Sequence, residues 1–253
     1  MIIKPKNLRR TLFLDIETVS KYATLSEESD TMIALWKKKC SQILRKPIDE
    51  LSDEEASETY INRAGIFAEF AKVACITLGY LAFDDDAPPI LKLKTLIGEE
   101  KELLIDFCDL LEKHYDDPDK DFLCGHNIKE FDVPFICRRC VVNGVEMPKM
   151  LNISGKKPWQ VGHLIDTMEL WRFGDYKNYT SLSLLAGTLG IPTPKDDIDG
   201  SMVGHVYWNE DDMERIVIYC EKDVITVCQV ACRLAGMDEI DASDIVYVRP
   251  KMK

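Results

Sequence analysis

The sequence predicts an α/β protein built on a mixed β-sheet with helices on both faces. Three β-rich apolar runs come first, at residues 11–17 (TLFLDIE), 73–83 (VACITLGYLAF) and 90–98 (ILKLKTLIG). Two short buried strands follow, at residues 121–126 (DFLCGH) and 163–167 (HLIDT), each set among helix-like segments. Consecutive β runs favour antiparallel pairing, and a strand-helix-strand rhythm favours parallel pairing. We therefore expect a five-stranded mixed sheet.

The chain between the first two strands predicts two helices. Residues 26–46 (SEESDTMIALWKKKCSQILRK) and 52–70 (SDEEASETYINRAGIFAEF) both begin with a serine and nearby acids, which cap a helix N-terminus and suit its dipole. These helices enlarge the first hairpin, so we expect a helical insertion at about residues 20–70. With 253 residues, of which 46% are hydrophobic, the chain can bury one full core. We expect a single domain that spans residues 1–253.

Further helices are expected on both sides of the two later strands. Apolar residues recur at helical spacing in residues 98–115 and again in residues 130–144. Three more helices are expected around residues 168–173, at residues 180–190 and over the long segment 209–236. Three strands followed by alternating strands and helices is an order that suits a ribonuclease H-like, three-layer fold.

The charge balance limits how this chain could bind a nucleic acid. It has 44 acidic and 32 basic residues and a formal net charge of −12, which argues against partners held by non-specific attraction to polyanions. A nucleic-acid substrate therefore needs a local basic rim, or cations bound among carboxylates that reverse the sign of the site. Composition does not separate these two options.

The nine cysteines are odd in number and scattered through apolar segments, a usage typical of reduced thiols in the cytosol. Cys137 and Cys140 form a lone C-x-x-C motif, but no second pair has zinc-like spacing, so ordinary thiols are favoured. The first residues lack the apolar run of a signal peptide, and no segment reaches the roughly eighteen apolar residues of a membrane span. We expect a soluble, cytoplasmic protein that does not act at a membrane.

Two carboxylates end the first predicted strand. Asp15 and Glu17 are two residues apart, so on a strand their side chains project to the same side. Like charges this close repel each other unless a cation lies between them, and carboxylate oxygens are the ligands that Mg²⁺ or Mn²⁺ select. A D-x-E pair in an acid-rich chain is equally well a solvated strand end, so this motif alone leaves both interpretations open.

A further acid follows the buried strand of residues 121–126, in the segment GHNIKEFDVPFI. Asp132 falls in the first turn of the next helix, Asn127 offers an amide there, and Phe131 offers a ring. These groups suit a site that holds a base or a sugar together with a metal ion. The alternative is structural: Asn127 and Asp132 cap the helix, and Phe131 packs in the core.

The third element is the segment YCEKDV in the long helix of residues 209–236. Tyr219 and Asp223 are four residues apart and therefore lie on one face of the helix. Their neighbours on that side include Ile216 and Thr226, so we expect the pair to be half-buried. In the alternative interpretation, Tyr219 packs its ring and Asp223 joins a surface salt bridge.

Taken together, the three segments resemble the motifs of one enzyme superfamily. LDIET, HNIKEFDVPF and YCEKDV are similar, in order and in fold position, to the three motifs of DEDD-type 3′-5′ exonucleases of the tyrosine subtype. More narrowly, the chain from about residue 11 to about residue 235 resembles stand-alone exonucleases related to the proofreading domain of family B DNA polymerases. Little sequence follows the third motif, so we expect no polymerase domain and do not extend the proofreading role to this protein.

The resemblance implies a hydrolase that uses two divalent cations, Mg²⁺ or Mn²⁺, roughly 3.5 to 4 Å apart. It implies that Asp15 bridges both ions, that Glu17 and Asp223 complete the site of the attacking water, and that Asp132 holds the second ion. Tyr219 would then hydrogen-bond the water and orient it. These five residues are the expected catalytic residues, and the four acids are the expected metal ligands.

The substrate implied by the resemblance is the 3′ end of single-stranded DNA, from which nucleoside 5′-monophosphates are released. Glu17 or a group at Thr18 would bind the terminal 3′-hydroxyl, and Asn127, Phe131 and Lys195 are the other expected substrate contacts. RNA is a near alternative, since the same acids would serve both polymers and only a contact to the 2′-hydroxyl separates them. A non-catalytic nucleic-acid-binding or scaffold module on the same fold is the more distant alternative.

A few other polar residues near these motifs have weaker claims. Lys156, Lys157 and Trp159 lie in a loop and are candidate strand contacts, although such lysines are usually just solvated. Asp166 ends a predicted strand, where it either touches the site or caps the next helix. His126 does not match the general base of the histidine subtype, because Tyr219 already occupies that position, so we expect a structural or weakly substrate-facing role.

Overall fold

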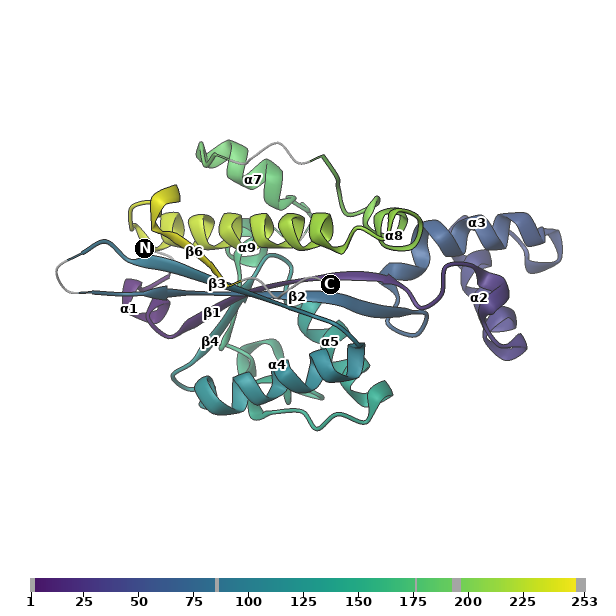
Figure 1. The fold of residues 1–253 in the computed structure, drawn as a ribbon, viewed down its shortest axis with the longest axis horizontal. Coiled ribbons are helices and arrows are strands. Elements are labelled where there is room, and N and C mark those ends of the chain that lie inside the picture. The colour runs from purple at the N-terminus through teal and green to yellow at the C-terminus, as the bar shows by residue number, and fades with distance from the viewer. Residues whose placement is uncertain (1–2, 85–86, 176, 193–196, 249–253) are drawn as a thin grey trace.

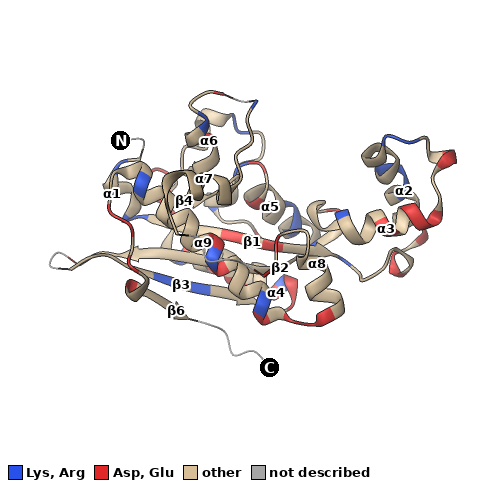
Figure 2. Ribbon diagram, turned by 90° about the horizontal axis from the view of Figure 1, so that it is seen from above, with Lys and Arg blue, Asp and Glu red and all other residues tan. Residues whose placement is uncertain are grey.

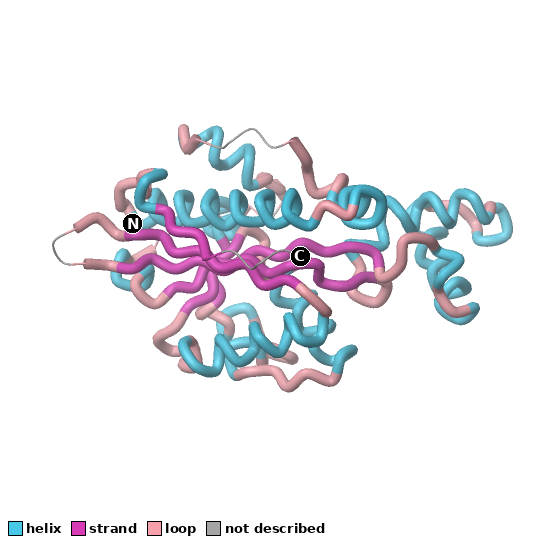
Figure 3. Tube along the Cα trace, in the orientation of Figure 1, coloured by secondary structure: helices cyan, strands magenta, loops and turns pink. Residues whose placement is uncertain are grey.

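A computed structural model of the chain describes residues 3–84, 87–175, 177–192 and 197–248. At its centre lies a six-stranded sheet in the order β5-β4-β1-β2-β3-β6, with helices above and below it (Figure 1 and Figure 3). β2 pairs antiparallel with β1 and β3, whereas the other pairs are parallel, so the predicted mixed sheet is confirmed. The strands are β1 (Thr11–Ser20), β2 (Ala71–Ala82), β3 (Ile90–Ile97), β4 (Phe122–Gly125), β5 (Leu164–Asp166) and β6 (Ile245–Val248).

The sequence predicts five strands, and the strand that it misses is β6. This strand follows the long C-terminal helix and pairs in parallel with β3, where Ile245 lies opposite Leu91. It is only four residues long, and Val246, Tyr247 and Val248 are all exposed. A short strand at a sheet edge buries little apolar surface, so its sequence lacks the pattern that identifies a core strand.

One face of the sheet is covered by α9 (Met213–Ala235), which packs across β1 and β2. Its apolar residues recur every three or four positions, and Ile216, Cys220, Val224 and Val227 are all buried. The apolar residues that recur with the helical period therefore form the face of α9 that packs on the sheet. The shorter helices of the described chain are α1 (Pro5–Leu8), α6 (Thr167–Arg172), α7 (Leu182–Leu189) and α8 (Val203–His205), the last continued by a π-helical turn at Val206–Glu210.

The opposite face of the sheet is covered by α4 (Glu100–His114) and α5 (Asp132–Asn143) (Figure 1). Arg139 of α5 forms a buried ion pair with Glu100 of α4 at 2.6 Å. Glu100 also accepts a hydrogen bond from the backbone nitrogen of Val73 in β2 at 2.9 Å. This one carboxylate therefore ties both helices to the sheet.

Alternate residues of β1 point to opposite helical layers. Leu12 and Leu14 belong to the core beneath α4 and α5, whereas Phe13 packs with residues of α9. Asp15 and Glu17 are in phase with Phe13 along the strand. Their carboxylates therefore project toward α9, which decides which helix completes the acidic site.

The chain between β1 and β2 forms α2 (Asp30–Leu44) and α3 (Asp53–Arg63), which project from one end of the sheet (Figure 1). These helices enclose a small core around Trp36, which is fully buried and donates from Nε1 to the backbone oxygen of Ala56 at 2.8 Å. The ring of Tyr60 meets the Trp36 ring edge-on, with 5.3 Å between the centroids. The insertion thus has a small hydrophobic core of its own and can hold a fixed position beside the sheet.

All nine cysteines are free thiols, and all except Cys137 are buried. In the C-x-x-C motif, the Cys137 thiol donates to the backbone oxygen of Leu151 at 3.3 Å, and Cys140 Sγ lies 4.0 Å from Cys108 Sγ. The two thiols therefore point to different partners. No helix within the described residues has both the length and the apolar character of a membrane span.

Candidate active site

The acidic end of β1 faces α9. Asp15 lies opposite Thr77 of β2, and Glu17 lies opposite Cys75. The register then shifts between Glu17 and Thr18, which is a β-bulge of the kind that re-aims side chains beside active sites. Figure 2 shows the acidic segment within β1. Each of the two carboxylates offers an oxygen within 4.8 Å of the other, so the pair could share a bound cation.

The loop after β4 brings a third carboxylate to the same strand. Asp132 is the first residue of α5 and is only 3% exposed. Its Oδ1 accepts a hydrogen bond from the backbone nitrogen of Ile16 at 3.2 Å, across 116 residues of sequence. Ile16 lies between the two acids of β1. The second motif is therefore fixed against the first one by a direct contact.

Helix α9 brings the third motif over the same point. The Cys220 thiol donates toward Asp15, with Oδ2 at 3.4 Å and the backbone oxygen at 3.5 Å. Asp223 follows one turn later, and its charge acts on both Asp15 and Glu17, so its carboxylate belongs to the same cluster. Tyr219 lies one turn before Asp223 and is partly buried against the apolar residues at this end of α9.

Burial and mutual repulsion raise the pKa values of three carboxyls in this cluster. Burial is the largest cause for Asp15, and the charges of Asp132 and Asp223 add to it, so its pKa lies well above the ordinary value. Burial and then the charge of Asp15 raise the pKa of Glu17 in the same way. Burial raises the pKa of Asp132 to about 7, even though the hydrogen bond from Ile16 lowers it. Without a cation, the cluster holds protons that isolated carboxyls would release.

The donor set of this cluster fits divalent cations. Within the described residues, Asp15, Glu17 and Asp132 form no ion pair with Lys or Arg. Burial and hydrogen bonding to Cys75 raise the pKa of the Cys220 thiol well above its ordinary value, so this thiol keeps its proton and acts as a donor. The available ligands are carboxylate oxygens, which Mg²⁺ and Mn²⁺ prefer to sulfur.

A cavity of about 260 Å³ opens beside Glu17. Its described lining comes from the end of β1, the end of α3 with the turn that follows, Phe131, and the turn before α8. The Thr18 hydroxyl donates to the backbone oxygen of Gly65 in the insertion at 2.7 Å. A Cβ on Gly65 would lie 3.2 Å from the Thr18 carbonyl oxygen, so glycine allows this close approach. The insertion therefore forms one wall of the cavity beside the acids.

Only some of the residues expected to contact the substrate line this cavity. Thr18 and Phe131 both line the cavity beside Glu17. Asn127 is not part of its described lining; it adopts a left-handed φ of 64°, and its backbone nitrogen donates to Asp166 Oδ1 at 3.0 Å. The buried Oδ1 of Asn127 accepts no hydrogen bond from the described residues. Lys195 lies outside the described residues.

The loop candidates are not among the residues that line this cavity. Lys156 lines a different cavity, which it shares with Asp166. Lys157 is exposed, and Trp159 is 79% exposed. The structure therefore gives these three residues no contact with the described acidic cluster.

Asp166 and His126 have structural partners. Oδ1 of Asp166 caps α6 by accepting from the backbone nitrogens of Met168 and Glu169 at 3.0 and 3.2 Å. The His126 ring forms hydrogen bonds with the Thr167 hydroxyl and with the backbone oxygen of Thr180, at 2.9 and 2.8 Å. Burial lowers the pKa of His126, which favours the neutral ring. The capping interpretation of Asp166 therefore holds.

Sequence reasoning missed two residues of this region. Cys220 lies inside the third motif, three residues before Asp223, so helical spacing alone would have placed its thiol on the acidic face. Arg63 ends α3 and lines the cavity beside Glu17. No local pattern indicates this role for Arg63, because it depends on how the insertion packs against β1.

The sheet, its helical layers and the converging carboxylates describe a nuclease-type domain, and a solved structure has a similar fold. The family B DNA polymerase from the hyperthermophilic archaeon Pyrobaculum calidifontis matches with a TM-score of 0.54 at 15% sequence identity. The match covers 88% of this chain but 24% of the polymerase chain. At this identity the similarity concerns the fold. A search of curated proteins gives no match.

The chain belongs to a family described as predicted 3′-5′ exonucleases related to the exonuclease domain of PolB, whose sequence model matches residues 66–246. The matched part includes Asp132, Tyr219 and Asp223 but begins after Asp15 and Glu17. Membership supports a nuclease function and a nucleic acid as the class of substrate. The two acids of β1 enter the site through the tertiary structure, which places them against Asp132 and α9.

Proposed function

We propose that this protein is a metal-dependent 3′-5′ exonuclease that degrades single-stranded DNA from its 3′ end and releases nucleoside 5′-monophosphates. The observation that carries the proposal is the convergence of carboxylates from three distant segments on one buried point. Asp15, Glu17 and Asp132 have raised pKa values there, so their ionised forms are costly in the metal-free protein. A cluster that destabilises the fold unless cations bind to it points to a metal-dependent function.

The four acids, Asp15, Glu17, Asp132 and Asp223, would hold two divalent cations, either Mg²⁺ or Mn²⁺. Bound there, such ions supply positive charge that stabilises the phosphoryl group and the leaving oxygen, and they lower the pKa of water. The same ions would reverse the sign of an acidic site in a chain of net charge −12, so that a polyanion can approach it.

Other residues of the chain would position the reacting groups. The Ile16 amide holds Asp132 in place, and the Cys220 thiol restrains Asp15. Tyr219 would hydrogen-bond the attacking water and orient it toward the phosphorus, as in the tyrosine subtype of these exonucleases. Its phenol need not take the proton, since water of lowered pKa requires no strong base.

The cavity beside Glu17 supports a single strand as the substrate. Its volume of about 260 Å³ is below the roughly 300–1,000 Å³ typical of small-ligand pockets, so it has no room for a base pair and would hold part of one terminal nucleotide. Phe131 would stack on a base, and Glu17 or Thr18 would bind the terminal 3′-hydroxyl. Arg63 is exposed and forms no ion pair within the described residues, so it is available to a phosphate.

DNA is the proposed polymer because the family is related to the exonuclease domain of a DNA polymerase. Asn127 and Lys195 would add further contacts to the strand. The free thiols of all nine cysteines support a reducing compartment, so we propose a cytoplasmic location.

The proposal is tested by incubating the purified chain with end-labelled oligonucleotides in Mg²⁺, Mn²⁺ or EDTA. Single-stranded DNA labelled at its 5′ end should shorten progressively, and DNA labelled at its 3′ end should release a labelled mononucleotide first. Asp15→Asn and Asp223→Asn should abolish both reactions while strand binding persists. Asp238→Asn removes an exposed carboxylate and should leave both reactions unchanged.

Matched substrates separate the alternatives. Blunt duplex DNA should be degraded more slowly than a single strand, and Arg63→Ala should raise KM more than Arg138→Ala, which removes an exposed arginine on α5. Cleavage of RNA but not of DNA would establish the exoribonuclease alternative. Metal binding without cleavage of either polymer would establish a non-catalytic nucleic-acid-binding module and refute the proposed enzyme.

A further inference from the structure

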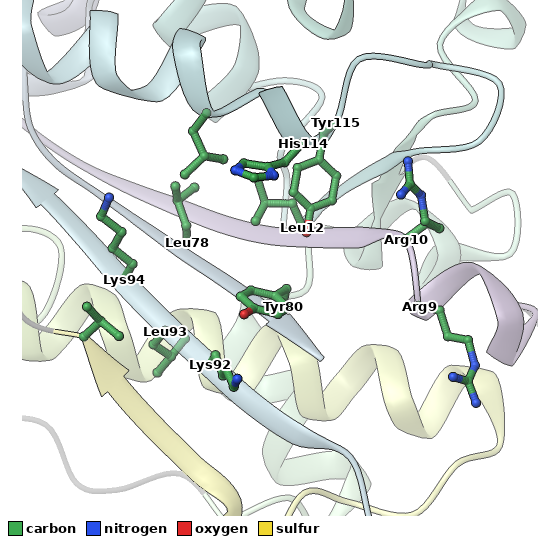
Figure 4. A pocket seen from close by; sticks show the side chains of 12 residues that line it. Arg9, Arg10, Leu12, Leu78, Tyr80, Lys92, Leu93, Lys94, His114 and Tyr115 are labelled. Atoms are coloured by element: carbon green, nitrogen blue, oxygen red, sulfur yellow. The ribbon is translucent and has the colours of Figure 1, made fainter. Parts of the chain in front are cut away.

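A second and larger cavity, of about 470 Å³, lies toward the start of β1, and Figure 4 shows the side chains that line it. It is lined by residues from the start of β1, from β2 and β3, and from the end of α4. Arg9 and Arg10 of this lining precede β1, whereas Leu78 lies opposite Leu14, the neighbour of Asp15. The cavity is therefore centred nearer the start of β1 than the carboxylates are, although its lining reaches close to them along the strand.

The two sites also lie on opposite faces of the sheet. Leu12, Tyr80 and Lys92 are cross-strand neighbours in β1, β2 and β3, and all three line the second cavity. Leu12 belongs to the core beneath α4, whereas Asp15 contacts α9 through Cys220. A ligand in the second cavity would therefore touch no residue of the acidic cluster.

The lining of this cavity is basic. Arg9, Arg10, Lys92, Lys94 and His114 all contribute to it, and no described lining residue is acidic. This is a local exception in a chain whose 44 acidic residues outnumber its 32 basic ones. Figure 2 shows the basic segment on β3. The cavity is thus a region of positive potential on an otherwise acidic protein.

The basic residues of this lining differ in their partners. Arg10 pairs with Asp121, and the guanidinium of Arg9 lies 4.4 Å from the centre of the Phe83 ring. Lys92 and Lys94 form no ion pair with any described residue. They alternate with buried leucines on β3, so both ammonium groups project from the same face. Two like charges held on one face favour an anion between them.

Aromatic side chains stand beside the two lysines. Tyr80 lies opposite Lys92 in the sheet and is 42% exposed. Tyr115, after the end of α4, lines the same cavity (Figure 4). Burial, and then the nearby Tyr80, raise the pKa of Tyr115 to about 12, so the Tyr115 phenol stays neutral. Both tyrosine rings can stack on an aromatic ligand. A ring next to fixed cations is the combination that binds nucleobases and phosphates.

We propose that this cavity is a second binding site for a nucleoside phosphate unit, whose base stacks on Tyr80 and whose phosphate lies between Lys92 and Lys94. The unit is either one nucleotide of a single strand or a free nucleotide. The strand form rests on the nuclease function proposed above, because a second grip on the polymer would keep it bound between cleavage steps. The free-nucleotide form does not depend on that function.

The test measures binding to the full chain carrying Asp15→Asn, in EDTA, so that catalysis does not enter. The probes are a labelled oligo(dT), followed by fluorescence anisotropy, and dTMP, followed by NMR shifts of the amides at 78–80 and 92–94. The double change Lys92→Ala with Lys94→Ala should weaken binding and reduce the salt slope of the oligo(dT) affinity by about 0.7, the value for the one phosphate contact on a single strand that the two lysines share. Replacing the exposed Lys101 and Lys149 by alanine changes the net charge equally and should have no such effect.

Stacking is tested separately with substitutions of Tyr80. Tyr80→Leu should weaken binding of the responding probe about tenfold, in the range measured for base stacking, while Tyr80→Phe should retain it. A response to the lysine changes with oligo(dT) alone assigns the site to a strand, and a response with dTMP alone assigns it to a free nucleotide. Equal affinities for all variants would overturn the proposal. It would also be overturned if poly-glutamate displaced the probe and Tyr80→Leu had no effect, because the cavity would then bind any anion and not a nucleotide. Because nuclease activity is measured separately, on the protein that retains Asp15, failure of the binding proposal can be distinguished from failure of the proposed nuclease function.

Discussion

Neutralising Asp132 should make the metal-free protein more stable while removing its function. The carboxyl of Asp132 is 3% exposed, and burial raises its pKa from 3.8 to about 7. Asp132→Asn removes the charge but keeps an Oδ1 that can accept the hydrogen bond from Ile16. The substitution therefore separates the electrostatic cost of the cluster from its packing.

The size and pH dependence of this effect follow from the pKa shift. A carboxyl whose pKa is higher in the folded protein costs stability as pH rises from its unfolded value to its folded value, here from about 4 to about 7. The full cost of the Asp132 charge above pH 7 is about 4 kcal/mol, at 1.36 kcal/mol for each pKa unit. At pH 5 the cost is smaller, about 1 to 2 kcal/mol. The gain from Asp132→Asn should therefore grow with pH up to about 7 and then stay constant.

The assay is urea unfolding in EDTA at several pH values between 4 and 8, followed by tryptophan fluorescence. The free energy of unfolding of Asp132→Asn should exceed that of the unsubstituted protein at pH 8 by up to about 4 kcal/mol, and the two should converge near pH 4. Asp238→Asn, on an exposed loop, serves as the control and should follow the unsubstituted protein. Mn²⁺ should raise the Tm of the unsubstituted protein more at pH 8 than at pH 5, since cations compete with protons for the same oxygens.

A variant that is less stable than the unsubstituted protein in EDTA at pH 8 would refute this reasoning. It would mean that Asp132 contributes through its contacts and not through repulsion within the cluster. A gain in stability that is independent of pH would also contradict it, because the proposed cost exists only when the carboxyl is ionised.

Three further substitutions test residues that surround the acidic cluster. Tyr219→Phe keeps the ring and should lower kcat about 10²-fold while the Tm rise with Mn²⁺ is unchanged; an unchanged kcat would exclude a role in orienting water. Trp36→Ala removes the centre of the insertion core and its bond to Ala56, so it should cost about 3–5 kcal/mol and expose residues 20–70 to limited proteolysis. Gly65→Val would press on the Thr18 carbonyl and should reduce turnover of single strands without loss of metal binding.

Local patterns in the sequence predicted most of the helices and strands because backbone geometry fixes their side-chain period. The serine expected to cap the second insertion helix does so, since Ser52 accepts from the backbone nitrogen of Glu55 at 3.1 Å. The first insertion helix was expected to begin at Ser26, but its cap is Ser29, which accepts from the backbone nitrogen of Met32 at 3.4 Å. Strand β6 was wrongly left out, because its four residues are mostly exposed and have no buried face to set a pattern. Local sequence patterns thus predict a helix or strand that buries one face against the core, and they miss a strand that stays exposed.

The local sequence around Asp166 is compatible with two roles for this residue. Its position at the end of a strand and the start of a helix allows both a cap and a site residue. In the fold its carboxylate accepts from the backbone nitrogens of Met168 and Glu169 and also from those of Asn127 and Lys129. The cap was predictable, whereas the two contacts to the loop after β4 depend on the pairing of β4 with β5.

By itself, the sequence determined that Asp15 and Glu17 share one side of a strand and that Tyr219 and Asp223 share one face of a helix, since both statements follow from a fixed period within a single element. Only the tertiary structure decided that these faces meet. The contact of Asp132 with Ile16 spans 116 residues and that of Cys220 with Asp15 spans 205. Contacts of this kind depend on how whole elements pack, because no periodicity within one segment encodes the position of another.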